Sequence, residues 1–378
     1  MKKLYTFFLF LFSISNYSQS NSLTESSKVS ILTCGTGNES YSLYGHTGIR
    51  IKDSLRGIDI VYNYGAFDFD TPNFMLKFVK GDLQYFVTTN SYQDFEYSYK
   101  YENRSIYEQE LNISIEKKQE LYKNLNSSLF SDDRFYTYKF IDRNCTTMVI
   151  DKINEILGEE IITTVKPIAF SYRDILYPYL ENHYFEKLGI NIIFGEKVDR
   201  KAETLFLPLE LHSVLKNSQY NGKLLVENNK TIFEAEKLEF KESLINSPYL
   251  IILLLALIVF INNKKIISVY FTIIALLGVF LLLVGIYSFH EEVLWNYNIL
   301  LFNPLLCCFI FSLYKRNSKI IITWGRINLI CIILHFLLII NKVDLMLLLP
   351  FTIAHFVIVS RIIITCKKET KIKKTIVL

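Results

Sequence analysis

Hydrophobic residues divide the chain into two unlike parts. Charged residues are concentrated before about residue 245, whereas the stretch from Leu244 to Cys366 consists of apolar runs separated by short polar breaks. Five runs reach or approach the roughly 20 apolar residues that a helix needs to cross a bilayer. The pattern predicts a soluble module followed by an all-α transmembrane domain over residues 244–366. Its five helices are expected at residues 244–261, 266–289, 299–314, 320–340 and 345–366.

The connections between these runs alternate in charge. Lysine and arginine gather after the first, third and fifth runs, while the other two connections carry acidic residues. Because basic loops remain in the cytoplasm, residues 20–243 are expected on the outside. The loop at residues 290–298 is expected on the same side, and the basic tail at residues 367–378 in the cytoplasm. The formal charge of +4 is therefore mostly a topology signal and is too small to argue for a nucleic-acid partner.

The first residues have the layout of a secretion signal. A basic start at Lys2 and Lys3 precedes an apolar centre at residues 4–12 and a small, polar exit at residues 13–20. This predicts a signal peptide over residues 1–19, with an uncleaved anchor as the alternative. Under both interpretations the following domain is exported.

Cysteine usage leaves two thiols in the exported domain. Four of the six cysteines lie in or at the edge of the apolar runs, which leaves Cys34 and Cys145. A disulfide between them is possible in an oxidising compartment. Lipidation of Cys34 is disfavoured because it lies too far beyond the apolar centre of the signal. The 15% aromatic content, with only 14 Gly and 7 Pro, excludes collagen-like and disordered chains.

A strand-like segment carries the first candidate chemical group. Residues 41–52 alternate as a half-buried strand does, with Tyr44, His46, Gly48, Arg50 and Lys52 on one face. A break at residues 53–57 leads to a second strand-like run at residues 58–64, so the two are expected to form a hairpin. Folding about the break places Asn63 opposite or near His46. A buried structural histidine is the alternative interpretation of this segment alone.

A helix start carries the second candidate group. Residues 146–157 have an apolar helical stripe that Gly158 ends, and Asn144 suits the N-cap position. Cys145 is then the first helical residue, where the helix dipole and unpaired amides favour a thiolate. A small buried hydrophobe, the commoner fate of a free cysteine, does not explain the capped position.

Together, a cysteine, a histidine and an asparagine supply a nucleophile, a base and a group that orients the base. The order His46, Asn63, Cys145 is reversed relative to ordinary papain-like enzymes. It resembles the circularly permuted papain-like enzymes, which include lecithin:retinol acyltransferase. The expected fold is an α+β permuted papain-like (NlpC/lecithin:retinol acyltransferase-like) exported domain followed by the five-helix transmembrane domain.

Further segments resemble, in order, the motifs of the Lnb-type bacterial lipoprotein N-acyltransferases. The residues from Asn298 to Pro304, with His290 before them, also look like that family's membrane part. The resemblance extends from about Val29 to the last span. In the exported domain it rests on Tyr44-Gly-His-Thr-Gly-Ile-Arg50, Val61-Tyr-Asn-Tyr-Gly-Ala-Phe-Asp-Phe69, Arg143-Asn-Cys-Thr-Thr147, Ser171-Tyr-Arg-Asp174 and Phe206-Leu-Pro-Leu-Glu-Leu211.

The resemblance implies acyl transfer from a membrane phospholipid to the N-terminal amine of lipoproteins, at the inner membrane and through a thioester on Cys145. It implies that Cys145 and His46 are catalytic, and Asn63 joins them through the expected hairpin. The backbone amides of Cys145 and Thr146 are expected to stabilise the oxyanion. The chemistry requires no metal and no cofactor. The expected supporting residues are Asn144, Thr146, Arg143 and Tyr44, and the expected substrate contacts are Arg50, His290, Trp295 and Asn298.

Two other functions remain open from the sequence. A membrane-tethered NlpC-like cell-wall peptidase or amidase would use the same cysteine and histidine with water as acceptor, although a tether needs only one span. A non-catalytic membrane scaffold would use the fold alone. Arg50 and Arg143, candidates for holding a lipid phosphate, have surface ion pairing as their alternative. The remaining histidines are interpreted as surface or packing residues (His183 and His212) and as groups bonded to neighbouring helices (His335 and His355).

Overall fold

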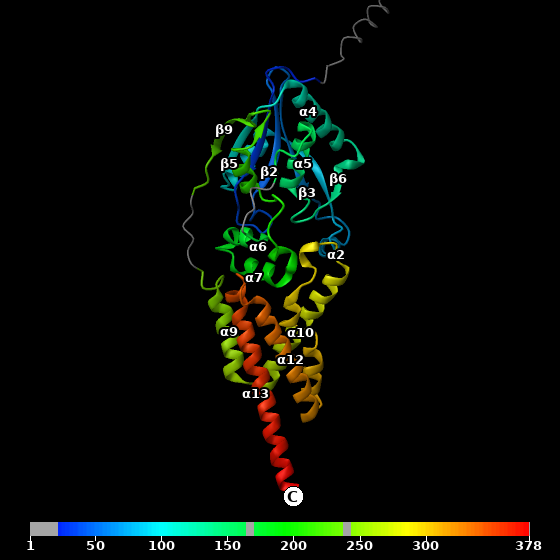
Figure 1. The fold of residues 1–378 in the computed structure, drawn as a ribbon, viewed down its shortest axis with the longest axis vertical. Coiled ribbons are helices and arrows are strands. Elements are labelled where there is room, and N and C mark those ends of the chain that lie inside the picture. Colours follow the sequence, from blue (N-terminus) through cyan, green and yellow to red (C-terminus); the bar gives the residue numbers. More distant parts are fainter. Residues whose placement is uncertain (1–21, 164–169, 237–242, 378) are drawn as a thin grey trace, which may run out of the picture.

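The computed structural model describes residues 22–163, 170–236 and 243–377. The molecule is elongated, with a sheet domain at one end and a bundle of helices at the other (Figure 1). The signal peptide expected at residues 1–19 lies outside the described residues. The first helix of the bundle begins at Pro248, and the expected division of the chain at residue 243 stays a prediction.

The sheet domain is built on seven antiparallel strands in the order β6-β4-β3-β2-β1-β5-β9. The strands that contribute to the site are at its centre. A separate two-stranded ribbon pairs β7 (Gln219–Tyr220) with β8 (Lys223–Leu224). The bounds of the seven strands are β1 Lys28–Cys34, β2 His46–Asp53, β3 Ile58–Ala66, β4 Gln84–Ser91, β5 Ile106–Leu111, β6 Phe135–Thr137 and β9 Val226–Phe233.

Helices cover both faces of this sheet. On one face, the apolar sides of α4 (Ile115–Leu129) and α5 (Cys145–Leu157) pack with Ile49 and Ile51 of β2 in the main core. On the other face, α3 (Tyr92–Tyr101) places Phe95 against a smaller cluster. The strand alternation predicted for residues 41–52 is confirmed only from His46 onward, because residues 41–44 form a turn and β2 begins at His46.

The predicted hairpin is also confirmed. β2 and β3 pair from Asp53 opposite Ile58 to Gly48 opposite Asn63. Beyond Asn63 the register with β4 shifts before Ala66, so the end of β3 is irregular next to His46. Such irregularities re-aim side chains at sheet ends.

A layer of short helices lies between the sheet and the membrane helices (Figure 1). It has its own apolar cluster, in which Ile141, Tyr172 and Phe206 are buried. This layer therefore connects the loop before α5 to the bundle below. Its elements are α6 Tyr172–Leu176, η2 Tyr177–Leu180, α7 Tyr184–Ile193 and η3 Glu196–Asp199, whereas α8 Pro208–Leu215 packs into the main core through Leu211 and Leu215.

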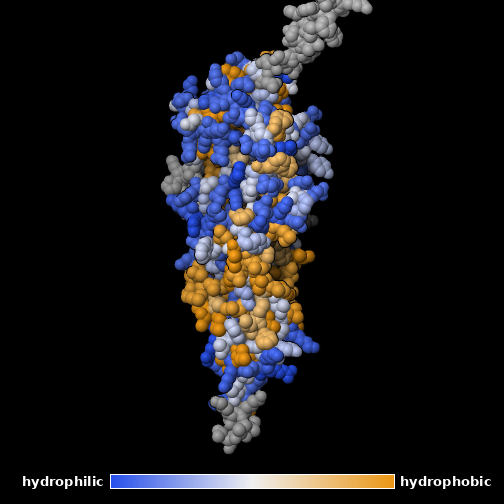
Figure 2. Space-filling view, turned by 90° about the vertical axis from the view of Figure 1, so that its right-hand side faces the viewer, coloured by the Kyte–Doolittle hydropathy of each residue, from blue (hydrophilic) through white to orange (hydrophobic). Residues whose placement is uncertain are grey.

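The C-terminal part forms a helical membrane module. On the face shown in Figure 2, a hydrophobic band lies between two hydrophilic regions. Three described helices are long and apolar enough to cross a membrane, namely Lys264–Tyr287, Ser318–Ile339 and Leu345–Ile372. The elements are α9 Pro248–Ile261, α10 Lys264–Tyr287, η4 Glu291–Val293, η5 Tyr297–Leu300, α11 Leu306–Tyr314, α12 Ser318–Ile339 and α13 Leu345–Val377.

The prediction of five spanning helices is not confirmed. The run at residues 299–314 is broken, because η5 ends at Leu300 and α11 has only nine residues. Pro304 lacks the backbone N–H that a continuous helix would use. The neighbouring Asn303 side chain donates through Nδ2 to Asn328 Oδ1 on α12 at 3.1 Å. The run at residues 244–261 gives a helix of 14 residues. Three helices of spanning length and two shorter ones thus replace five equal spans.

The remaining elements are α2 (Phe74–Lys80) and η1 (Asp132–Arg134) in the sheet domain. At the other end of the chain, α13 continues past Cys366, where the fifth span was expected to end. The sheet domain is mixed α/β, which is compatible with the expected fold class. Its assignment as a permuted papain-like fold stays a prediction.

Candidate active site

Asn144 caps the helix that carries Cys145. Its side-chain oxygen accepts hydrogen bonds from the amides of Thr146 at 2.8 Å and Thr147 at 3.1 Å, and Thr147 Oγ1 accepts from the Asn144 amide at 2.8 Å. This reciprocal capping box satisfies donors that a helix start leaves unpaired. Gly158 ends α5 in the left-handed conformation. The predicted helix start and end are therefore confirmed, and Cys145 is the first helical residue.

The cap is itself held from two sides. Asn144 Nδ2 donates to the carbonyl oxygens of Phe140 at 2.8 Å and Phe206 at 2.9 Å. Asn144 is buried, so these bonds are shielded from water. They fix the position of Cys145 relative to the loop before it and to the start of α8.

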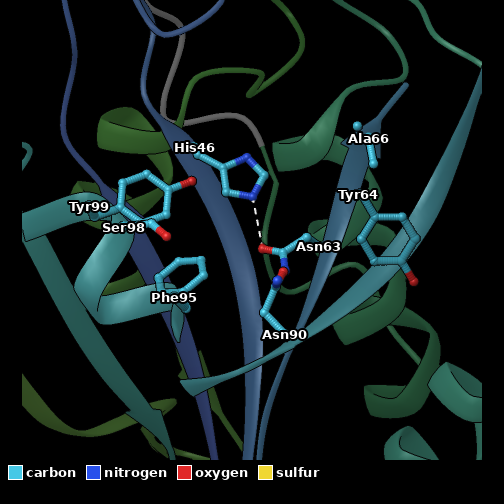
Figure 3. A pocket seen from close by; sticks show the side chains of 9 residues that line it. His46, Asn63, Tyr64, Ala66, Asn90, Phe95, Ser98 and Tyr99 are labelled. Atoms are coloured by element: carbon cyan, nitrogen blue, oxygen red, sulfur yellow. Dashed lines mark hydrogen bonds between the residues drawn. The ribbon is translucent and has the colours of Figure 1, made fainter. Parts of the chain in front are cut away.

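His46 and Asn63 are joined across the hairpin. The distance between His46 Nε2 and Asn63 Oδ1 is 3.1 Å (Figure 3). Asn63 Nδ2 donates to Val61 O at 3.3 Å and to Asn90 Oδ1 at 3.0 Å, which identifies the oxygen as the atom that faces His46. An amide oxygen only accepts, so Nε2 carries a proton. Nδ1 is then the nitrogen that can accept a proton from a thiol.

The surroundings of Cys145 favour the thiolate. Burial raises the pKa of the thiol, but a hydrogen bond with His46 and the positive charge of that ring lower it. The amide of Thr47 and the hydroxyl of Thr146 lower it further, so the pKa of Cys145 lies below its ordinary value. Thr47 Oγ1 and Thr146 Oγ1 are themselves 3.2 Å apart. This is the environment of a nucleophilic cysteine.

A hollow of about 240 Å³ opens beside His46, and Asn63, Asn90, Phe95 and Tyr99 help to line it (Figure 3). A second hollow, of about 260 Å³, shares His46, Gly65, Ser98 and Tyr99 with the first. Gly65 has φ +98°, and a Cβ there would lie 3.9 Å from Cys145 Cβ. The shared wall therefore borders the thiol.

Sequence reasoning missed the contribution of α3 and β4 to this hollow. Ser98 and Tyr99 of α3, which begins at Tyr92, line the hollow. The Tyr99 ring lies nearly parallel to His46, with centroids 6.3 Å apart. The helical spacing of Phe95, Ser98 and Tyr99 was the available signal, because it places the three on one side of a helix.

Cys34 lies at the end of β1, paired with His46. Both Cys34 and Cys145 are free thiols in the structure, so the possible disulfide is not formed. Burial raises the pKa of Cys34 well above its ordinary value, although the charge of Arg104 and a hydrogen bond with Tyr99 oppose it. Cys34 is thus an inert thiol beside a reactive one.

One detail of the expected oxyanion site is wrong. The amide of Thr146 is already bonded to Asn144 Oδ1, because the N-cap side chain satisfies the donors of the first turn. It is therefore not available to a developing oxyanion. Cys145 itself remains the expected backbone donor.

Arg50 is occupied by the chain's own carboxylates. It bonds Asp59 through Nε at 2.7 Å and Nη2 at 2.8 Å, and Glu108 through Nη1 at 3.1 Å. Its guanidinium also lies 3.2 Å from the centre of the Tyr92 ring. The structure favours the ion-pair alternative for Arg50 and offers a lipid phosphate no open side.

Two of the expected supporting residues, Arg143 and Tyr44, are not among the described residues that line the two hollows. Arg143 is exposed, and its guanidinium lies 5.2 Å from the centre of the Tyr136 ring. The ring of Tyr44 packs edge-on against Phe140 at 5.4 Å. Tyr44 thus supports the loop before Cys145, and the described residues that line the two hollows do not include it.

The outer-loop residues divide into packed and exposed positions. His290 Nε2 donates to Phe78 O at 2.9 Å, which joins the loop to α2. Asn298 is fully buried and bonds His335 on α12 and the Asn191 carbonyl on α7. The expectation that Asn298 contacts substrate is therefore wrong, because its amide is used within the protein. Trp295 is 80% exposed.

The interpretations of three other histidines are confirmed as to position. His212 is buried and stacks on Tyr107. His335 bonds Asn298, and His355 bonds the Tyr270 hydroxyl on α10 at 2.7 Å.

A buried polar network joins the layer of short helices to the bundle. Arg173 is 1% exposed and donates to Asp199 Oδ1 at 2.6 Å. Asp199 Oδ2 in turn accepts from Lys342 at 2.6 Å and from the Tyr297 hydroxyl at 2.9 Å. Lys342 follows α12, so the connection between α12 and α13 lies against the layer of short helices.

Comparison with family descriptions gives one match. The Lnb N-terminal periplasmic domain matches residues 15–176, a range that contains His46, Asn63 and Cys145. Comparison with curated proteins and with solved structures found no match.

Proposed function

Because this membrane protein carries an Lnb N-terminal periplasmic domain, we propose that it is a lipoprotein N-acyltransferase of the bacterial inner membrane. Its donor is a membrane phospholipid, and its acceptor is the N-terminal amine of a diacylglyceryl-cysteine lipoprotein. The observation that carries the proposal is the pairing of a capped, acidified Cys145 with the His46–Asn63 couple.

The first half of the reaction forms a thioester. His46 Nδ1 accepts the proton of Cys145, and the thiolate attacks the carbonyl carbon of a donor ester. The carbon–oxygen bond of the resulting tetrahedral species breaks, and the leaving lysolipid oxygen takes the proton from His46. The low pKa of Cys145 favours attack, and the Cys145 amide faces the developing oxyanion.

The second half transfers the acyl chain to nitrogen. The lipoprotein amine attacks the thioester carbonyl, and the carbon–sulfur bond breaks. His46 takes a proton from the amine and gives it to the sulfur of Cys145. This step restores the free thiol and the neutral imidazole. An amide forms from a thioester without an external energy source because the thioester is the more reactive acyl derivative.

The contacts of the catalytic loop support a lipid substrate. Lys139 Nζ bonds the Phe289 carbonyl at the end of α10. The Ile141 amide bonds the carboxylate of Glu292, which is 1% exposed. Since the loop at residues 139–144 leads into Cys145, the thiol is held next to the outer ends of the membrane helices, where ester bonds of lipids lie.

Mass spectrometry of lipoprotein N-termini tests the proposal. Cells depleted of the protein are complemented with the wild type or with Cys145→Ala. N-acylation is expected with the wild type only. If N-acylation continued with Cys145→Ala in cells that hold no second N-acyltransferase, the proposal would fail. A cell-wall peptidase would instead alter peptidoglycan fragments while the lipoproteins remained unchanged.

Trapping tests the thioester itself. Purified protein incubated with phospholipid alone should gain one acyl chain on Cys145, and neutral hydroxylamine should remove it. Cys145→Ser would form a hydroxylamine-resistant ester or none. An enzyme that acylated lipoproteins without ever carrying a chain on Cys145 would contradict this mechanism, and a scaffold would show neither reaction.

A further inference from the structure

An apolar surface is exposed on α2 and the loop before it. Phe69, Met75 and Leu76 are 71%, 65% and 67% exposed, and Phe78 is 45% exposed. Phe74 contacts the main core and packs with Phe69, with ring centres 5.1 Å apart. The segment at residues 69–78 is thus a folded part of the domain that presents large apolar side chains outward. Contiguous apolar surface of this kind marks an interaction site.

This surface is fixed to the end of a spanning helix. The Phe289 amide donates to Lys80 O at 2.7 Å, and Ser288 Oγ donates to Val79 O at 2.9 Å. His290 adds its bond to Phe78 O. These three bonds hold the last turn of α2 against the residues that follow Tyr287, where α10 ends. Figure 1 shows α2 beside the upper end of α10, between the sheet and the bundle.

Gly81 makes this contact possible. It follows α2 in the left-handed conformation with φ +76°, and a Cβ there would lie 2.9 Å from His290 Cδ2. A glycine therefore allows α2 to end directly on the outer loop. The position of α2 relative to the membrane helices is set by its backbone carbonyls, which accept hydrogen bonds from Ser288 Oγ, the Phe289 amide and His290 Nε2.

The apolar surface continues the surface of the span. At the outer end of α10, Tyr287 and Phe289 are 42% and 53% exposed. Lys80 lies over the Phe289 ring at 5.2 Å, and Lys77 and Lys80 occupy the last turn of α2. Aromatic residues and lysines at the end of a span are typical of the membrane–water boundary, and a short helix with apolar and basic sides is suited to lie there.

We propose that the segment at residues 69–78 is embedded in the outer leaflet of the bilayer, with Phe69, Met75 and Leu76 among the lipid chains. The occupant of this surface is lipid because the surface is continuous with the lipid-facing side of α10. The sheet domain is then held to the membrane at a second point besides the spans.

This anchor lies next to the hollow of the candidate site. Phe67 lines the second hollow and packs on Phe69 with ring centres 4.9 Å apart. Two residues before it, Gly65 borders Cys145. The chain therefore leads from the thiol to the embedded side chains within a few residues, and the hollow is kept at the level of the leaflet.

Quenching by brominated lipid tests the anchor without any acyl transfer. In full-length protein with Trp295→Phe and Trp324→Phe, which removes both native tryptophans, Leu76→Trp supplies one fluorophore. The protein is reconstituted in phosphatidylethanolamine and phosphatidylglycerol vesicles that contain bromines near the headgroup end of the acyl chains. The tryptophan is expected to lose most of its emission and to shift to shorter wavelength. Met75→Trp repeats the measurement if Leu76→Trp does not fold.

Leu55→Trp is the matched control. Leu55 is 76% exposed and lies in the turn between β2 and β3, at the opposite end of β2 from His46. Its emission should be that of tryptophan in water and should not respond to the brominated lipid. Water-like, unquenched emission from Leu76→Trp and Met75→Trp would overturn the proposal. A blue-shifted but unquenched emission would also overturn it, because a protein surface would then cover α2.

Discussion

Asn63 reaches His46 although its strand partner is Gly48. Oδ1 of Asn63 lies 3.1 Å from His46 Nε2, while the backbone pairs Asn63 with the residue two positions further along β2. A Cβ at position 48 would lie 3.3 Å from Asn63 Oδ1 and 3.0 Å from Val61 Cγ1. The glycine therefore leaves the space through which the amide leans toward the imidazole.

Removing that amide should slow acylation of Cys145. Asn63→Ala deprives His46 Nε2 of its acceptor, so the ring loses its orientation and the imidazolium loses a partner. Hydrogen bonds to charged groups contribute about 1.5–3 kcal/mol, which corresponds to roughly a 10- to 100-fold lower rate. The measurement is the rate of acyl-enzyme formation from phospholipid. Asn63→Asp, which keeps an acceptor, should retain more activity than Asn63→Ala.

Asn90 provides the graded comparison. It accepts from Asn63 Nδ2 at 3.0 Å and has no bond with His46 among the described contacts. Because Val61 O still holds the Asn63 amide, Asn90→Ala should slow the same reaction by only a few-fold. A loss of rate as large as that of Asn63→Ala would contradict this prediction, because the reaction would then depend on Asn90 as much as on Asn63.

The reactivity of Cys145 should depend on pH through its lowered pKa. The thiolate is the reacting form, so alkylation by iodoacetamide should reach half its maximal rate at a pH below that of an ordinary cysteine. His46→Ala removes the hydrogen bond and the charge that counteract the effect of burial on the pKa of Cys145. The half-maximal pH should therefore move upward, above the ordinary value.

Labelling is followed on the peptide that contains Cys145, with the Cys34 peptide as internal control. Cys34 should remain unlabelled in the folded protein, because burial raises its pKa and excludes the reagent. If the pH of half-maximal alkylation were unchanged in His46→Ala, His46 would not be the group that lowers the pKa of Cys145.

Two glycines should respond differently to the same substitution. Gly45 has φ +83°, and its Cβ would lie 2.5 Å from the Cys34 carbonyl oxygen; Gly57 has φ +67° with nothing within 4 Å. Gly57→Ala should lower the free energy of unfolding by about 1–2 kcal/mol, the conformational penalty alone. Gly45→Ala adds a backbone clash and should lower it by several times more or prevent folding. Thermal denaturation in detergent measures both, and equal effects would contradict the predicted clash.

Asp199→Asn should loosen the junction between the domains. It removes the charge that faces Arg173 and Lys342, and breaking a buried pair costs about 3–5 kcal/mol. The readout is the midpoint of thermal denaturation, together with proteolysis between α6 and α8. Asp142→Asn is the control, because Asp142 is 40% exposed in its pair with Lys197 and such pairs contribute about 0–1 kcal/mol. A smaller effect at Asp199 than at Asp142 would contradict the role of this network.

The parts of the site that the sequence predicted are those set by local rules. The N-cap at Asn144 and the stop at Gly158 depend on residues within one helix, and the hairpin depends on alternation and a short break. These rules were sufficient to place Asn63 near His46 and Cys145 at the start of a helix, whereas the expectation that Cys145 meets His46 rested on the resemblance to permuted papain-like enzymes. The local rules said nothing of Asn90 or Tyr99, because β4 and α3 reach the site only through sheet order and packing across its second face.

The predictions about Arg50, residues 299–314 and Asn298 were wrong for the same physical reason, since each depends on contacts between residues that are distant in the sequence. Arg50 looked available because its partner Asp59 lies on the adjacent strand β3 and its partner Glu108 lies on β5, two strands away from β2, and a sequence pattern does not connect these positions. Hydropathy treated residues 299–314 as one span because the buried Asn303–Asn328 bond makes a polar break tolerable inside the bundle. Asn298 was expected to contact substrate because the sequence does not show its burial or its bonds with His335 and the Asn191 carbonyl.

The direction of β2 has a consequence for how substrates meet the enzyme. Its His46 end faces the short-helix layer and the bundle, and its Asp53 end points away from them (Figure 1). A lipid substrate that reaches this end arrives by diffusion in a plane. The quantity that governs encounter is therefore the mole fraction of the lipid in the leaflet, and diluting vesicles at constant composition should leave the rate per enzyme unchanged.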